Sequence, residues 1–257
     1  MNHRPKKKLG QHFLLNKEVL KKIVKIKKLE NKDIIEVGPG TGELTKYILK
    51  ENPKSLICIE KDLELKKYLE KIVTTYPDKV NMIYGDIKKI NIKTFYKKKR
   101  KIIIGNLPYN IATTLILDYL EFPNEYKFMI FMVQKEVADR LTAKTGEKNY
   151  GRISVLAQVY SKIKKVFDVE AKSFYPAPKV SSSVLLIEPV NFTKIQFQPF
   201  KNFLRKSFLY RRKKFKNNLQ KFYKDIEKLP DLNLYVNKRA QQFSPKEFIE
   251  IYKTLFL

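Results

Sequence analysis

The sequence GNLPY, which follows an apolar run at residues 102–104, contains the side chains best suited to chemistry. The side-chain oxygen of Asn106 and the main-chain carbonyl of Leu107 can accept two hydrogen bonds from an amine. Such bonds draw the nitrogen towards a tetrahedral geometry and aim its lone pair at an electrophile. Pro108 stiffens the turn, and the ring of Tyr109 offers a surface on which a base can stack. A proline turn without a function is the alternative interpretation.

Three earlier apolar runs also lead into groups suited to a nucleoside. In EVGPGTGEL, Gly38 and Gly40 let the backbone pass close to a ligand. Glu60 ends the next run, where its carboxylate can accept from both ribose hydroxyls, and Asp86 follows the third, where it can accept from an adenine amine. The spacing E-x-G-x-G-x-G differs from the G-x-G-x-x-G of dinucleotide sites and resembles the loop with which class I methyltransferases bind S-adenosylmethionine (SAM). Taken alone, a glycine-rich turn or an acidic residue at the start of a helix is common and indicates no ligand.

A second aromatic face is available in the segment FYPAPKV, where Phe174 precedes two stiffening prolines. A base taken out of its stack is held between aromatic or apolar faces. We therefore expect Phe174 to face Tyr109 across the base. The alternative is a loop aromatic that packs into the core.

Apolar runs alternate with amphipathic segments through most of the chain. Five strands are expected, at residues 33–37, 55–60, 80–84, 101–106 and 127–133. The first four lead into helical spacing, which predicts an α/β fold with a mostly parallel sheet and a ligand at the carboxyl ends of its strands.

Two further strands, at 164–169 and 181–189, are expected to end the sheet as an antiparallel pair. After Pro189 the apolar residues follow helical spacing. We therefore predict a catalytic domain over 1–189, with a basic N-terminal segment, and a small helical domain over 190–257 that contacts RNA.

The charge balance predicts a polyanionic partner, because 54 Lys and Arg residues stand against 26 Asp and Glu, a net charge of +28. Lysine enrichment by an AT-rich genome is the alternative. The densest cationic segment, RKSFLYRRKKFKNNLQK, interleaves aromatic residues with its charges, which suits phosphates, although a solvated helix face is also common. Its predicted RNA contacts are Arg205, Lys206, Arg211, Arg212, Lys213, Lys214 and Lys216.

Other features indicate the compartment and the cofactor class. The single cysteine, Cys58, fits a reducing compartment, and the longest apolar run, 128–133, is too short for a membrane helix. The start of the chain has no secretory pattern, so a cytoplasmic protein without a membrane partner is expected. Two histidines and one cysteine give no metal-site spacing, so no metal is expected.

Segments along the whole chain resemble the small-subunit (16S) ribosomal RNA adenine dimethyltransferases of the KsgA type. They include GQHFLLN (10–16), EVGPGTGELT (36–45), GNLPYNIATTLI (105–116), FYPAPKVSSSV (174–184) and FLYRRKKFKNNL (208–219). The resemblance implies a Rossmann-like class I methyltransferase that acts as a monomer. Its expected activity is SAM-dependent dimethylation of two adjacent adenines near the 3′ end of 16S rRNA, in a precursor of the 30S subunit during its biogenesis.

The resemblance also assigns residues to the cofactor site. These are His12, Leu14, Gly38, Gly40, Glu60, Asp86 and Asn106. Position 12 departs from the family pattern, in which Asn is common. Two alternatives are a 23S rRNA dimethyltransferase of the macrolide-resistance type and a non-catalytic ribosome-assembly factor. Leu107, the SSSV segment and RRKKFKNNL favour the small-subunit family, and the intact NLPY argues against a non-catalytic factor.

Overall fold

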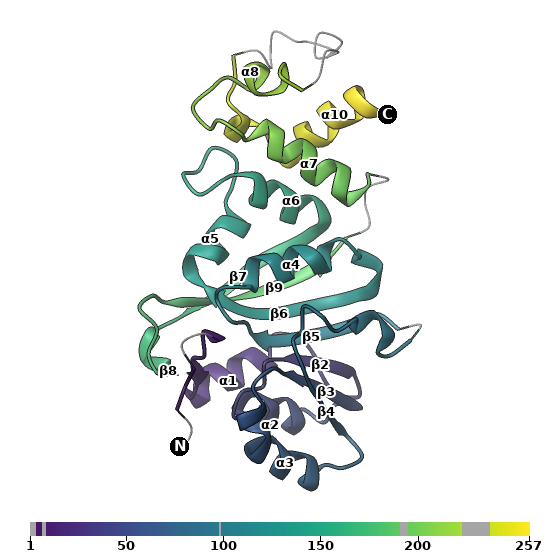
Figure 1. The fold of residues 1–257 in the computed structure, drawn as a ribbon, viewed down its shortest axis with the longest axis vertical. Helices are drawn as coiled ribbons and strands as arrows, with labels where there is room; N and C mark the ends of the chain where they lie inside the picture. The colour runs from purple at the N-terminus through teal and green to yellow at the C-terminus, as the bar shows by residue number, and fades with distance from the viewer. Residues whose placement is uncertain (1–3, 7–8, 98, 191–194, 223–236) are drawn as a thin grey trace. The chain divides into compact units, whose positions relative to one another are not determined.

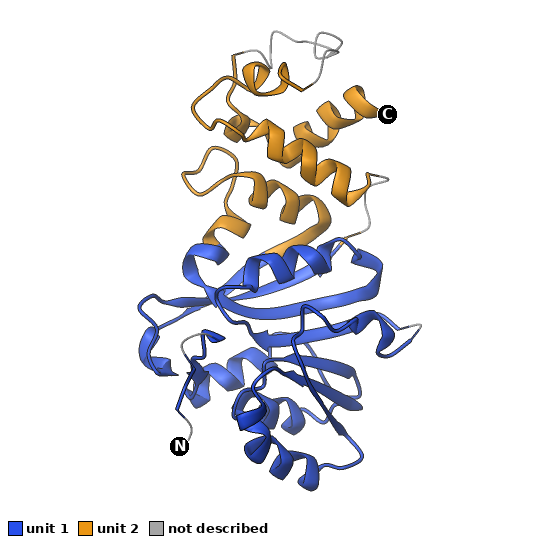
Figure 2. Ribbon diagram, viewed as in Figure 1, with its two compact units in different colours: residues 1–138, 164–189 blue, residues 139–163, 190–257 orange. Residues whose placement is uncertain are grey.

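A computed structural model of the chain describes residues 4–6, 9–97, 99–190, 195–222 and 237–257. The chain divides into two compact units (Figure 2). The first comprises residues 1–138 and 164–189, and the second comprises 139–163 and 190–257. Residues 139–163 thus belong to the same unit as the C-terminal helices, although they precede the domain boundary expected after residue 189.

A seven-stranded sheet forms the centre of the first unit (Figure 1). Its strands are β2 (Asp33–Val37), β3 (Ser55–Glu60), β4 (Val80–Tyr84), β5 (Lys101–Asn106), β6 (Tyr126–Gln134), β7 (Ser161–Val169) and β9 (Ser182–Pro189). They lie in the order β4-β3-β2-β5-β6-β9-β7. The strands β4, β3, β2, β5 and β6 are parallel, and β9 runs antiparallel to β6.

The parallel register aligns the carboxyl ends of the central strands. Val37 at the end of β2 lies opposite Ile59 on one side and Gly105 on the other. The residues that follow these positions therefore come out at one edge of the sheet. Glu60 and Asn106 are two of them, which is the arrangement that the sequence predicts for a ligand site.

Helices cover both faces of the sheet. On one face, α1 (Lys17–Val24), α2 (Glu43–Lys50) and α3 (Lys66–Thr75) share a hydrophobic cluster with strand residues such as Ile130. The adjacent Phe131 points to the opposite face, because side chains alternate along a strand. There the ring of Tyr119, from α4 (Ala112–Leu120), lies 6.1 Å from that of Phe131.

A two-stranded antiparallel sheet joins the N-terminal segment to the loop before β9. It pairs β1 (Phe13–Leu14) with β8 (Phe174–Tyr175). Short 3₁₀ turns occupy Leu63–Leu65, Ile92–Thr94, Pro123–Glu125, Ala171–Ser173 and Ala240–Gln242.

The second unit is mainly helical and has an aromatic core. It contains α6 (Arg152–Tyr160), α7 (Phe197–Ser207), α8 (Phe215–Leu219) and α10 (Pro245–Phe256), and α5 (Lys135–Thr142) leads into it from the first unit. Phe203 lies within 6.2 Å of Phe248 and 5.5 Å of Tyr252, ring centre to ring centre. Across the described ranges, no helix combines the length and apolarity needed to span a membrane.

Candidate active site

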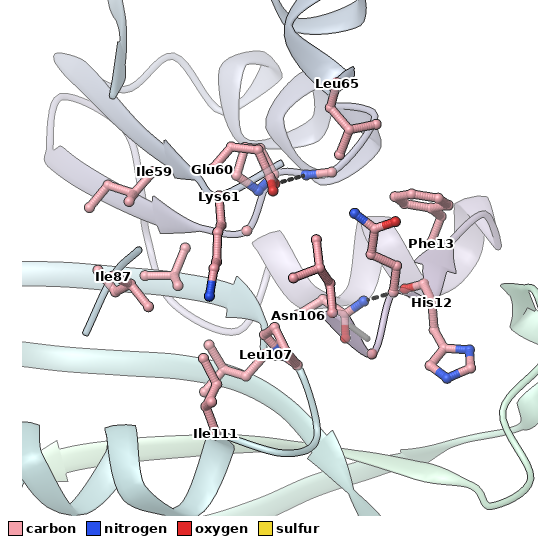
Figure 3. Close-up of a pocket in the computed structure, with 18 of the residues that line it drawn as sticks. His12, Phe13, Ile59, Glu60, Lys61, Leu65, Ile87, Asn106, Leu107 and Ile111 are labelled. Carbon is pink, nitrogen blue, oxygen red and sulfur yellow. Dashed lines mark hydrogen bonds between the residues drawn. The ribbon is translucent and has the colours of Figure 1, made fainter. Parts of the chain in front are cut away.

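One pocket at the carboxyl edge of the sheet gathers all seven predicted cofactor residues (Figure 3). Its walls come from the ends of β2, β3 and β5, from the turn after β4, and from residues 9–14 of the N-terminal segment. Leu107, Pro108 and Tyr109 line the same pocket. The residues predicted to hold the cofactor and those predicted to activate the amine therefore share one cavity.

The glycine-rich loop after β2 forms one wall of the pocket. Gly38 and Gly40 have φ angles of 70° and 62°, in the left-handed region that favours glycine. A Cβ added at Gly40 would lie 3.0 Å from the ring of Phe13. Side chains at these positions would strain the backbone or displace Phe13, which explains why both positions are glycine.

Glu60 is held by main-chain donors at the end of β3. Its Oε2 accepts from the Gly40 N–H at 3.0 Å and its Oε1 from the Asp62 N–H at 2.8 Å. Burial raises the pKa of Glu60 above its usual value, and these N–H groups oppose the shift. Each carboxylate oxygen can accept a second hydrogen bond, so the group can still receive two ligand hydroxyls.

Asp86 is engaged by a lysine that the sequence reasoning missed. The Nζ of Lys61 lies 2.8 Å from Asp86 Oδ2, and the Lys88 N–H donates to Oδ1 at 3.0 Å. The bond from Lys61 lowers the pKa of Asp86. Figure 3 shows the Lys61 side chain among the residues that line the pocket. A ligand amine that binds Asp86 must therefore share the carboxylate with Lys61.

The orientation of the Asn106 amide is fixed by the main chain. Its Nδ2 donates to the carbonyl oxygen of His12 at 2.8 Å (Figure 3). Because this bond uses the donor end of the amide, Oδ1 is the end available as an acceptor. The preceding Gly105 leaves room for close strand packing, since a Cβ there would lie 2.5 Å from the Val37 carbonyl.

Tyr109 is held from two sides. Its hydroxyl lies 2.7 Å from the Oγ of Ser182, the first residue of β9. Its ring stacks on the imidazole of His12, with ring centres 5.4 Å apart and an angle of 24° between the planes. The His12 Nδ1 lies 2.7 Å from the Pro176 carbonyl, which can only accept, so Nδ1 carries the proton. Sequence reasoning had no signal for these contacts.

Phe174 lies outside the set of pocket-lining residues. Its side chain is 5% exposed, belongs to the hydrophobic cluster of the first unit and lies opposite Leu14 in the β1–β8 pair. The neighbouring Tyr175 is exposed. The role of Phe174 as the second face for a base stays a prediction.

The predicted RNA-binding cations all lie in the second unit, but their surroundings differ. Arg211 donates to the main-chain carbonyls of Lys148 and Tyr150 at 3.0 and 3.2 Å. These bonds tie two segments of the unit together. The Nζ of Lys213 lies 4.8 Å from the ring centre of Tyr210. The remaining members of the predicted set are at least partly exposed, namely Arg205, Lys206, Arg212, Lys214 and Lys216.

Within the described ranges, the acidic residues form no metal-binding group. Among the described residues, no three His, Cys, Asp or Glu side chains gather closely enough to hold a metal ion.

The parallel sheet, the bare glycine loop and the acidic strand end define a class I SAM-dependent methyltransferase. The sequence profile of the family described as "Ribosomal RNA adenine dimethylase" matches residues 2–256. The chain belongs to this family. It is thus an rRNA adenine dimethyltransferase, as the sequence predicted, and the predicted fold class and SAM cofactor are confirmed.

Individual proteins agree with this assignment. The chain is 40% identical to "Ribosomal RNA small subunit methyltransferase A" of Wolbachia pipientis wMel, covering 95% of this chain and 87% of the relative. A dimethyladenosine transferase from Plasmodium falciparum superposes with a TM-score of 0.78 at 26% identity, covering 95% of this chain and 98% of that one. The 23S rRNA methyltransferase ErmE shares the fold, with a TM-score of 0.74 at 18% identity, covering 95% and 100% of the two chains.

Proposed function

We propose that this enzyme dimethylates the N6 amines of two adjacent adenines near the 3′ end of 16S rRNA. Its substrate is a precursor of the 30S subunit, on which it acts as a cytoplasmic monomer and contributes to subunit biogenesis. The main support for adenine N6 chemistry is the fixed amide of Asn106 at the carboxyl edge of the sheet. The similarity to small-subunit relatives supports the choice of 16S over 23S rRNA.

The pocket residues fit SAM. The loop at Gly38 and Gly40 allows a ligand to approach the backbone, Glu60 accepts from ribose hydroxyls, and Asp86 accepts from the adenine amine of the cofactor. When bound, SAM supplies an electrophilic methyl group on a sulfonium. We assign a further wall of the SAM site to His12 and Leu14 of the N-terminal segment.

Asn106 and Leu107 prepare the target nitrogen. An exocyclic adenine amine is a weak nucleophile because its lone pair is delocalised into the ring. The Asn106 Oδ1 and the Leu107 carbonyl accept from its two N–H groups and favour a tetrahedral nitrogen. The Asn106 amide needs no reorganisation for this role, since its Nδ2 is already bound to the His12 carbonyl. No side-chain base has to remove a proton before attack.

Tyr109 provides the stacking surface for the adenine. Base stacking on an aromatic ring contributes about 1–3 kcal/mol per base. The hydrogen bond to Ser182 and the contact with His12 hold the ring at one angle, so little conformational freedom is lost when the base arrives. Phe174 is the proposed second face, and movement of the β8 segment would be needed to bring its buried side chain to the base.

The second unit supplies phosphate contacts. Arg212, Lys213 and Lys216 lie on the described surface around α8 and can reach a polyanion. Arg211 has a mainly structural role in this proposal, because its guanidinium is bonded to two main-chain carbonyls. The remaining predicted contacts are Arg205, Lys206 and Lys214.

A methyl-transfer assay tests the proposal. Under-methylated 30S and 50S subunits are incubated with the protein and SAM that carries a radiolabelled methyl group, and the modified nucleotides are mapped. We expect label on two adjacent adenines near the 3′ end of 16S rRNA and none on subunits that are already methylated. Label on 23S rRNA would identify the macrolide-resistance type of activity, and no label on either RNA would indicate a non-catalytic assembly factor.

A further inference from the structure

Asp62 lies two residues after Glu60 and is buried although it carries a charge. Only 2% of the residue is exposed. Burying a carboxylate is costly unless it is paired and hydrogen-bonded, so its partners indicate what it does. One partner is the nearby Glu64 N–H, which donates to Oδ1 at 3.2 Å. Two others come from the N-terminal segment, more than fifty residues away in the chain.

Three contacts close a ring between Asp62 and this segment. The Lys6 Nζ donates to Asp62 Oδ1 at 2.6 Å, and the Gln11 Nε2 donates to Oδ2 at 2.7 Å. The Lys6 main-chain N–H donates to the Gln11 Oε1 at 2.7 Å. Lys6, Gln11 and Asp62 are called the Asp62 network below. The bonds from Lys6 and Gln11 outweigh burial and bring the pKa of Asp62 below its usual value, so the group is ionised at neutral pH.

The Asp62 network touches the cofactor pocket at two points. Gln11 lines the pocket together with its neighbours in residues 9–14. The main-chain N–H of Asp62 donates to Glu60 Oε1, so residue 62 also orients the proposed ribose acceptor. One residue therefore fixes both the N-terminal wall of the pocket and an acidic group inside it.

We propose that Asp62 is a positioning residue for SAM, which holds the N-terminal wall in its binding conformation through Lys6 and Gln11. This inference rests on the proposed placement of SAM in the pocket. The contribution comes from preorganisation: without the network, residues 9–12 have to be ordered when the cofactor binds, and that ordering lowers affinity. A wall that is held in place also keeps its contacts with bound SAM, so we expect the network to slow cofactor dissociation.

The test compares Asp62→Asn, Lys6→Ala and Gln11→Ala with the wild-type chain, by calorimetry and stopped-flow binding of SAM. We expect each variant to raise the Kd of SAM by about tenfold, mainly through faster dissociation, because bonds to a charged group are lost. The KM for SAM rises in parallel, whereas kcat at saturating SAM stays close to the wild-type value. Lys6→Ala combined with Asp62→Asn should weaken binding no further than either change alone.

Two controls separate this role from others. Lys21→Ala removes an exposed ion pair of similar length, to Glu18 at 2.8 Å on α1, and should leave SAM binding unchanged. Glu60→Ala tests the site itself: wild-type affinity in that variant would remove SAM from this pocket and overturn the inference with it. If Glu60→Ala weakens binding but the network variants lower only the melting temperature and not the affinity, Asp62 is a structural residue and the inference is wrong. If Asp62→Asn does not fold, Lys6→Ala provides the same test, because the Lys6 side chain is partly exposed and its loss is easier for the fold to tolerate.

Discussion

Glu36 allows a quantitative test of the core beneath the cofactor loop, through the change Glu36→Gln. The side chain is fully buried near the carboxyl end of β2, and its Oε2 accepts from the Cys58 thiol at 3.5 Å. Among the described residues, its Oε1 has no hydrogen-bond partner. Burial raises the pKa of Glu36 from 4.5 to about 7, and the nearby Glu60 charge acts in the same direction.

The sign of the pH dependence follows from this shift. The folded chain binds the Glu36 proton more tightly than the unfolded chain does, so the stabilisation is complete below pH 4.5 and is lost as the pH rises through about 7. A shift of this size corresponds to roughly 3 kcal/mol. A Gln side chain cannot ionise, so the Glu36→Gln variant loses no stability from this source over the same pH range. The free energy of unfolding of Glu36→Gln, minus that of the wild type, should therefore increase by about 2.5 kcal/mol between pH 5 and pH 8, slightly less than the full value because the unfolded chain is already mostly ionised at pH 5.

Urea unfolding at half-unit steps from pH 5 to pH 8.5 measures this difference. A difference in unfolding free energy that is the same at all pH values reflects how well the amide packs in the core, and it does not affect the result. Glu70→Gln, on the exposed face of α3, is the matched control and should give a flat difference. A flat difference for Glu36→Gln as well would refute the reasoning, because it would mean that the carboxylate is equally easy to ionise in both states.

The remaining predictions concern the site and its RNA contacts. Asn106→Ala should lower the single-turnover methylation rate by roughly 100-fold, with a much smaller change in SAM affinity by calorimetry; a wild-type rate would contradict the acceptor role. Tyr109→Ala should slow methylation about tenfold or more, and Tyr109→Phe, which keeps the ring but loses the hydroxyl bond, only a few-fold. Equal rates for the two variants would exclude stacking. Changing Arg212, Lys213 and Lys216 together to Gln should reduce the salt dependence of subunit binding. The slope of log K against log salt concentration should fall by about two to three units, and the affinity for SAM should stay unchanged. An unchanged slope in folded protein would place the RNA elsewhere.

The sequence was sufficient to predict the bounds of the central strands and the edge of the sheet at which the site lies. The expected bounds of β2, β3, β4 and β5 match the structure, because each is a short branched apolar run between polar or turn residues. Once those strands are parallel, Gly38, Glu60 and Asn106 must come out together at the carboxyl edge. This conclusion needs only strand order and direction, which periodicity and connection length largely determine.

Contacts between distant segments could not be predicted. β9 and β7 are neighbours at the end of the sheet, as predicted, but the antiparallel pairing of β9 with β6 on its other side had no signal in the sequence. The engagement of Asp86 by Lys61 depends on how β3 and the turn after β4 meet. The burial of Phe174 depends on its pairing with Leu14, about 160 residues earlier in the chain. Local propensity carries no information about such pairs, because they are decided by packing.

The bond between Asn106 and the N-terminal segment ends on a main-chain carbonyl, and every amino acid supplies one. This bond therefore does not depend on which side chain stands at position 12, although the His12 ring itself contacts Tyr109 and the Pro176 carbonyl. A change in the length of this segment would have a larger effect. Deleting one residue between Gly10 and Phe13 would shift the carbonyl by roughly 3.5 Å, beyond hydrogen-bond reach of the amide. The grip of the N-terminal segment on the Asn106 amide is thus set by the length of the segment, and not by the side chain that carries the carbonyl.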